Sequence, residues 1–197
     1  MIPYFSQPVW RLGPLSIHAF GAAAALAVVT GYLVAVRSAR AMRLDAGLTG
    51  RMYVVGALGG LLVGHLVAVA TAGAVQSAAG LAIGSLAVAA GFLWKCGRAA
   101  LPHLDALALA FPLAWALARA GCFMAHDHVG PPSAFFLAVR FPGGSRLDLG
   151  LIECLAALAT AALLWLLART RPAPGVLFAV LLIAAGFTRA AMRALER

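Results

Sequence analysis

The sequence predicts an all-α fold, a polytopic integral membrane helical bundle of about six transmembrane helices. Of its 197 residues, 63% are hydrophobic and only 11% are charged, whereas about a quarter of an average soluble domain is charged. Apolar runs recur along the whole chain, and charged, proline and glycine residues gather in the joints between them. Residues 1–197 are therefore expected to form a single transmembrane domain, with one long outer-face loop, 119–148, between the fourth and fifth helices.

Each apolar run predicts one helix. The runs are residues 17–36, 52–75, 78–93, 104–118, 149–167 and 175–190. The first is about 20 residues long, which exceeds a signal-peptide core of roughly 7 to 15 residues and predicts a retained anchor. The third and fourth are shorter than a usual span, so they form either tilted pairs around a cavity or a helix that crosses incompletely. Small residues in "GALGGLLVG" and "GSLAVAAG" predict close helix packing.

Basic residues in the joints predict the topology and account for the formal charge of +9. They follow the first, third and fifth runs, as Arg37, Arg40, Arg43, Arg51, Lys95, Arg98, Arg169 and Arg171. These joints are expected in the cytoplasm, which puts the N-terminus and residues 119–148 outside. Six crossings would also put Arg189 and Arg193 outside, so either the last helix lies in the interface or the count differs by one. The basic residues form no stripe with aromatics, and no nucleic-acid partner is expected.

The stretch "RAGCFMAHDHVG", residues 119–130, concentrates polar chemistry at the edge of an apolar run. Arg119 is expected to end the fourth helix and Arg146 to precede the fifth. Two guanidinium groups converging there predict a clamp for a phosphate, of which a phospholipid head group is the obvious source. The alternative is that both arginines only anchor the helices at the interface.

Glu153 is the second polar feature, about one turn inside the fifth predicted helix. An ionisable group at membrane depth is costly and usually serves a site or an ion pair. Glu153 lies seven residues after Arg146 and approaches it if the preceding loop folds back. A structural salt bridge at the membrane boundary is the alternative.

His126, Asp127 and His128 form the third polar feature. An imidazole beside a carboxylate is suited to acid–base work near neutral pH, although a solvated loop is the alternative. A metal site with Cys122 is not predicted, because imidazoles at i and i+2 share a metal only on an extended backbone and no second cluster supplies further ligands. Cys122 itself is expected to be a small packing residue. The three cysteines lie in separate segments and indicate no disulfide framework.

These motifs resemble the prolipoprotein diacylglyceryl transferase family along nearly the whole chain. "LGPLSIHAFG" is similar to the family's entry into its first helix, and "ALARAGCF" to its signature around Arg-x-Gly-Asn-Phe, with Cys122 in place of asparagine. Asp127 and Gly130 stand at the family's Glu and Gly, "AVRFPGG" resembles a strand-like segment, and "RLDLGLIE" matches at Arg146 and Glu153. Ala78 stands where the family has its catalytic histidine. The chain is identified as a divergent, shortened member.

The resemblance implies a bacterial inner-membrane enzyme, multi-pass, with its active face on the periplasmic side. The implied reaction transfers diacylglycerol from phosphatidylglycerol to the lipobox cysteine thiol of a prolipoprotein signal peptide, without a cofactor. Arg119 and Arg146 would clamp the phosphate, and His126 or His128 would replace the missing base. Substrate contacts would come from Asp127, Gly130, Glu153 and Cys122. An inactive relative that binds phospholipid or lipoprotein precursor is the alternative, and a small transporter is a further one.

Overall fold

The computed structural model describes residues 1–71 and 78–195, apart from the side chains of residues 12, 78, 79, 82 and 98. The Ala78 side chain and the joint after the second run therefore lie outside the described residues. Contacts divide the chain into two compact units. Unit 1 comprises Met1–Gly31, Ala110–Arg171 and Ala179–Arg197, and unit 2 comprises Tyr32–Leu109 and Pro172–Phe178.

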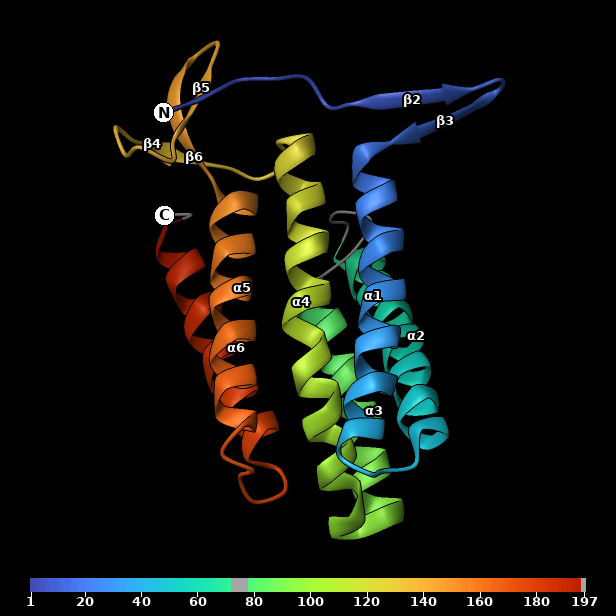
Figure 1. Cartoon of the computed structure of the whole chain (residues 1–197). Helices are drawn as coiled ribbons and strands as arrows, with labels where there is room; N and C mark the ends of the chain where they lie inside the picture. Colours follow the sequence, from blue (N-terminus) through green and yellow to red (C-terminus); the bar gives the residue numbers. More distant parts are fainter. Residues whose placement is uncertain (72–77, 196–197) are drawn as a thin grey trace. The chain divides into compact units, whose positions relative to one another are not determined.

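Six α-helices form in the described part of the chain, which confirms the all-α membrane bundle (Figure 1). They are α1 (Ala19–Ala41), α2 (Ala46–Ala70), α3 (Ala78–Cys96), α4 (Leu101–Ala125), α5 (Leu149–Ala168) and α6 (Val176–Leu195). All except α3 are long and apolar enough to cross a membrane, while the described apolar part of α3, Ile83–Cys96, is shorter. The chain is therefore a multi-pass membrane protein.

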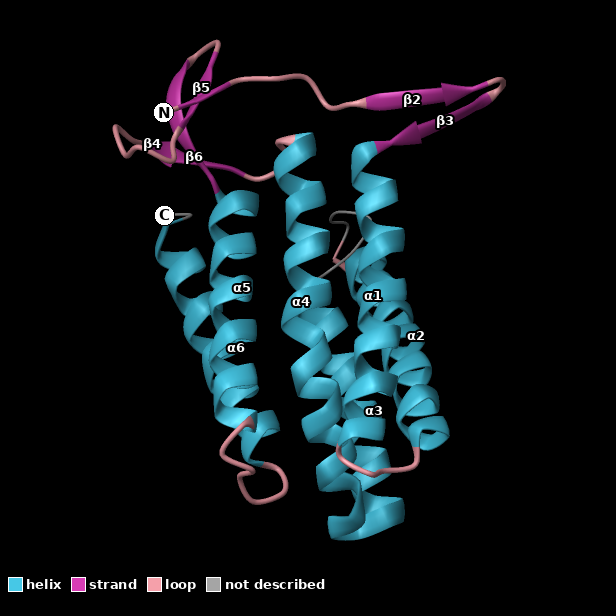
Figure 2. Cartoon of the chain, in the orientation of Figure 1, coloured by secondary structure: helices cyan, strands magenta, loops and turns pink. Residues whose placement is uncertain are grey.

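Strands gather at one end of unit 1, where α1 begins, α4 ends and α5 begins (Figure 2). They are β1 (Ile2–Pro3), β2 (Val9–Leu12), β3 (Leu15–His18), β4 (Val129–Pro132), β5 (Val139–Phe141) and β6 (Gly144–Asp148). One sheet has the order β1-β5-β6-β4, with β1 parallel to β5 and the other pairs antiparallel, and β2 and β3 form a hairpin. The strand-like segment expected at 138–144 is confirmed, and the predicted long loop contains the end of α4 and three strands of the sheet, β4, β5 and β6.

Two helix boundaries in unit 1 were predicted wrongly. The first helix begins at Ala19, and His18 lies in β3, because Gly13 with φ of 60° turns the chain into a hairpin whose strands pair up to His18. The fourth helix continues to Ala125, so Arg119 lies inside α4 and does not end it. The helix stops where His126 adopts a φ of 51°, the left-handed conformation typical of helix ends.

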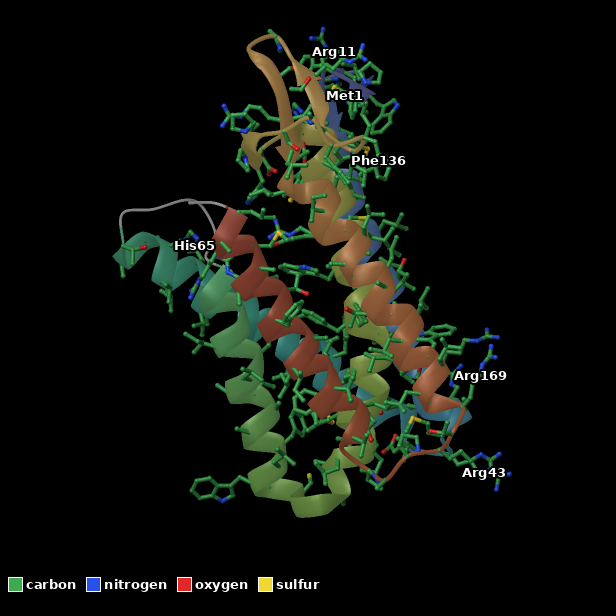
Figure 3. The ribbon with its side chains drawn as sticks, turned by 90° about the vertical axis from the view of Figure 1, so that its left-hand side faces the viewer. Met1, Arg11, Arg43, His65, Phe136 and Arg169 are labelled. Atoms are coloured by element: carbon green, nitrogen blue, oxygen red, sulfur yellow. The ribbon has the colours of Figure 1, made fainter. Side chains whose placement is uncertain are left out.

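Side-chain sticks show the two ends of α5 in unit 1 (Figure 3). Arg169, just after α5, lies at the end remote from Phe136 and the strands. The helix α6 runs back toward the strands, so its last turn, with Arg193, lies at their end. This arrangement separates the basic joint after α5 from the polar loop, as the predicted topology requires.

Helix ends in unit 2 are capped by carboxylates. Asp45 accepts hydrogen bonds from the backbone N–H groups of Gly47 and Leu48, at 2.8 and 3.0 Å, at the start of α2. Asp105 accepts from the N–H groups of Gly175 and Phe178, at 2.6 and 2.9 Å, at the start of α6. Carboxylates satisfy the unpaired N–H groups of a helix N-terminus and interact favourably with its dipole. These two acids therefore have structural roles.

Glycines bring the backbones of α2 and α3 into direct contact, which confirms the predicted close packing of these two helices. A Cβ atom on Gly84 would lie 2.5 Å from the carbonyl oxygen of Gly59 and 2.9 Å from Cα of Gly60. A Cβ on Gly80 would lie 2.7 Å from Cα of Gly64. Small residues permit this approach, and in lipid such packing contributes most of the helix association.

We expect Gly84→Ala to lower the free energy of unfolding by about 1–3 kcal/mol, because the added methyl group forces α2 and α3 apart. Gly91→Ala is the matched control on the same helix, since nothing lies within 4 Å of a Cβ placed there. That control is expected to leave stability unchanged or raise it, as alanine favours helices over glycine. The measurement is the thermal unfolding midpoint in detergent, and equal midpoints for the two variants would contradict the prediction.

Candidate functional site

A buried ion pair joins α4 and α5 near the strand end of unit 1. Arg119 Nε forms an ion pair with a carboxylate oxygen of Glu153, and both side chains are about nine-tenths buried. Arg119 Nη1 also lies 3.5 Å from the sulfur of Cys122, and the guanidinium carbon is 4.9 Å from the ring centroid of Trp115. Three contacts thus hold one guanidinium group at a fixed place, and the one with Trp115 had no signal in the sequence.

Close approach of α5 to α4 makes this pair possible. A Cβ atom on Gly150 would lie 2.8 Å from the backbone nitrogen of Phe123 and 3.1 Å from Cβ of Cys122. Glycine at this position therefore lets the first turn of α5 pack against the backbone of α4. The ion-pair partner of Glu153 is Arg119, which α4 presents to it because that helix continues past this arginine.

Arg146 lies in β6 and is held by a different partner. Its Nε donates to the carbonyl oxygen of Gly130 at 2.8 Å, across the pairing of β4 with β6. Gly130 has no room for a side chain, since a Cβ there would lie 2.9 Å from Leu149 Cδ2. The partners of the two guanidinium groups differ: Arg119 contacts Glu153 and Cys122, and Arg146 contacts Gly130. The predicted clamp by two arginines remains a prediction.

His126 is enclosed at the base of the sheet. Its Nδ1 donates to Oδ2 of Asp148 at 2.8 Å, and the side chains of this pair are 5% and 0% exposed. Four aromatic rings surround the imidazole at centroid distances of 4.6 to 5.5 Å, those of Tyr4, Phe5, Phe123 and Phe141. Asp148 also accepts a hydrogen bond from the N–H of Leu151 and so caps α5. His126 therefore joins the N-terminal segment, the sheet and α5.

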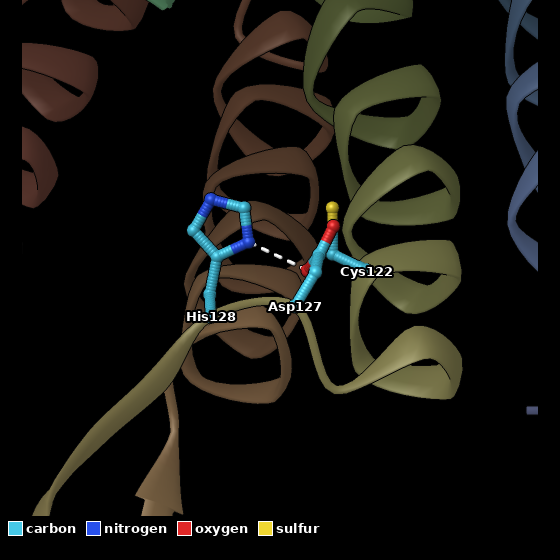
Figure 4. A group of neighbouring side chains, drawn as sticks. All are labelled: Cys122, Asp127 and His128. Atoms are coloured by element: carbon cyan, nitrogen blue, oxygen red, sulfur yellow. Dashed lines mark hydrogen bonds and ion pairs between the residues drawn. The ribbon is translucent and has the colours of Figure 1, made fainter. Parts of the chain in front are cut away.

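His128 points toward Asp127 and Cys122 beside the end of α4 (Figure 4). Its Nδ1 donates to Oδ1 of Asp127 at 2.6 Å, and these two side chains are 43% and 40% exposed. A hydrogen bond with the Cys122 side chain is the largest cause that raises the pKa of His128 to about 9; burial opposes it and Asp127 adds to it. At neutral pH the imidazole of the metal-free protein is therefore mostly protonated. Of the two candidate histidines, only His128 is open to a substrate.

Comparison with known protein families identifies the family to which the chain belongs. A family model described as prolipoprotein diacylglyceryl transferase matches residues 7–195. The chain belongs to the prolipoprotein diacylglyceryl transferase family. A search of curated proteins finds no match. The matched region contains α4, α5 and the strands β4 to β6, whereas β1, Tyr4 and Phe5 precede it. Family membership supports a diacylglyceryl-transferase-like function in general.

An open hollow of about 570 Å³ lies beside this site of the transferase-family fold. Polar groups of Gln7, Ser16, His18 and Asp127 line it together with apolar atoms of Ile17, Phe20, Gly21 and Ala125. The hollow is formed by the N-terminal segment with its β2–β3 hairpin, the start of α1 and the end of α4, all in unit 1. A lining of both kinds suits an amphiphile, whose polar head and apolar chains need different surroundings.

Sequence analysis missed two residues that organise the site of this transferase-family protein. Asp148 directly precedes an apolar run, a recognisable signal for a helix N-cap, but its pairing with His126 depends on the sheet. Gly150 gave no such signal, because its role depends on the distance between two helices that are separate in sequence. Long-range geometry of this kind is not encoded in local patterns.

Proposed function

We propose that this protein transfers diacylglycerol from phosphatidylglycerol to the lipobox cysteine thiol of a prolipoprotein, at the periplasmic face of a bacterial inner membrane. The observation that carries the proposal is the buried Arg119–Glu153 pair next to Cys122, Asp127 and His128, within a chain of this family. The reaction needs a cation for the departing glycerol phosphate and a group that handles the proton of the acceptor thiol. The site offers both.

Arg119 is our candidate for phosphate binding. A guanidinium group has five N–H donors, of which one is directed at Glu153 and one at Cys122. The remaining donors would bind phosphate oxygens, and the fixed position of the group would lower the cost of reorganisation in the transition state. Glu153 acts as a positioning residue. Arg146, on β6, would contribute a second positive charge.

His128, oriented by Asp127, is our candidate for proton transfer with substrate, and its neutral form, the minor one at neutral pH, would accept the proton of the acceptor thiol. His126 is buried and bound to Asp148, so we assign it a positioning role, although the sequence made the two histidines equal candidates. Ala78 stands at the family's histidine, and an inactive relative that binds phospholipid or precursor therefore remains the second candidate function. A transfer assay separates the two.

The test reconstitutes purified protein with phosphatidylglycerol and a lipobox peptide and detects the diacylglyceryl thioether by mass spectrometry. We expect product from the unmodified chain, and a rate about 100-fold lower for His128→Ala, the usual scale for loss of an acid–base group. Arg140→Ala is the control, because this arginine is exposed on β5 and has no role in the site. Absence of product, with phospholipid still bound in an Arg119-dependent way, would support the binding protein and contradict the transferase.

A further inference from the structure

Three different metal-ligand types converge at the outer end of α4. The sulfur of Cys122, a carboxylate oxygen of Asp127 and a ring nitrogen of His128 all lie within 4.8 Å of one another. Figure 4 shows the three side chains next to one another, with Nδ1 of His128 on the side of the other two. The sequence analysis considered His126 and His128 with Cys122 as metal ligands and did not predict a site. In the structure His126 is bound to Asp148, and Asp127 takes its place beside His128.

We propose that Cys122, Asp127 and His128 bind one divalent metal ion of the zinc class, and that its open coordination position takes the acceptor thiol. Thiolate, imidazole and carboxylate are each zinc ligands, whereas magnesium and calcium prefer oxygen ligands alone. Three protein ligands with a fourth position open to substrate are the arrangement of catalytic zinc sites. The part that concerns the thiol rests on the proposed transfer reaction, whereas the metal site does not.

The surroundings of the cluster fit a metal ion of charge +2. Cys122 is buried on α4 and gives the site a rigid sulfur ligand, while Asp127 and His128 are partly exposed and can adjust. Their closest atoms, now 2.6 Å apart, would separate to about 3.3 Å around tetrahedral zinc. The ion would displace the proton between them, as metal binding commonly does. Two anionic ligands neutralise the ion, and Glu153 already balances the nearby charge of Arg119.

Metal binding would supply the step that the family assigns to the residue replaced by Ala78. A thiol that coordinates zinc loses its proton and becomes a thiolate. That sulfur would attack the diacylglyceryl carbon bonded to phosphate oxygen; the C–S bond would form, the C–O bond would break, and its electron pair would leave with glycerol phosphate. The proton released from the thiol would end on the glycerol phosphate product, and with the ion bound His128 would act as a ligand and not as the proton acceptor. No oxidant or reductant is required, and Arg119 would stabilise the leaving group.

Cobalt titration of the tag-free protein tests the site without depending on turnover. We expect stoichiometric binding of Co²⁺ with a thiolate-to-metal absorption band in the near ultraviolet, displaced by Zn²⁺. Cys122→Ala should remove the band, and Asp127→Ala or His128→Ala should weaken binding by at least about 100-fold. Cys154→Ala is the matched control, since this cysteine is also unpaired and lies outside the cluster. A missing band, or one that survives Cys122→Ala, would overturn the metal site.

Two further measurements test the role of the ion. Adding a lipobox peptide should change the cobalt spectrum, because a second thiolate enters the coordination sphere, and a peptide with serine in place of cysteine should not change it. Where transfer is measurable, a chelator should abolish it and Zn²⁺ should restore it. An unchanged spectrum, or transfer that a chelator does not affect, would overturn thiol activation. The spectrum reports on the site even if the transfer reaction fails, so failure of one proposal is distinguishable from failure of the other.

Discussion

Arg119→Ala is expected to abolish measurable transfer and also to lower the free energy of unfolding by about 3–5 kcal/mol. The destabilisation follows because the carboxylate of Glu153 would remain buried without its partner. Glu153→Ala should be similarly destabilising, because it leaves the guanidinium buried and unpaired. Thermal unfolding midpoints in detergent measure the loss of stability, and the reconstituted assay measures the loss of transfer.

Replacing both partners separates stability from chemistry. The double variant Arg119→Met with Glu153→Leu removes both charges and keeps a similar volume, so most of the lost stability should return. Transfer should not return, because the cation that we assign to the phosphate is still missing. A stable double variant that transfers lipid at the original rate would remove Arg119 from the mechanism and leave it a purely structural residue.

Asp148→Ala is expected to cause the second large effect, a loss of about 2–4 kcal/mol. The side chain is fully buried and makes two hydrogen bonds, one that caps α5 and one that holds His126. Loss of a cap costs about 1 kcal/mol, and an unpaired buried imidazole adds about 1–3 kcal/mol. Thermal unfolding measures the total, and limited proteolysis within 126–148 should become faster because the sheet loses its attachment to α5.

A double-mutant cycle with His126→Ala checks this cause. His126 and Asp148 share one hydrogen bond. The sum of the stability losses of the two single variants should therefore exceed the stability loss of the double variant by about 1 kcal/mol or more. Asp148→Asn is a useful comparison, since asparagine caps helices as well as aspartate and should retain the N–H bond from Leu151. Additive losses in the cycle would show that His126 and Asp148 stabilise the fold independently.

The helical part of the fold could be predicted because the membrane imposes a simple rule on the sequence. Backbone polar groups in lipid must be paired within each segment, so long apolar runs become helices regardless of their neighbours. The runs at 149–167 and 175–190 correspond closely to α5 and α6. The ends were less predictable, as Arg119 shows, because charged residues can remain helical when a partner such as Glu153 compensates them.

The sequence by itself determined the membrane class, the helix count, the family and the polar segment that carries the site, since composition, run length and ordered motifs encode each of these locally. Only the tertiary structure decided the partners. In the structure Arg119 pairs with Glu153, and His126 is buried against Asp148. The side chains of Cys122, Asp127 and His128 lie together. These choices depend on how closely α4 and α5 approach and on how the chain turns at His126. Such distances arise from packing between residues far apart in sequence, for which no local pattern exists.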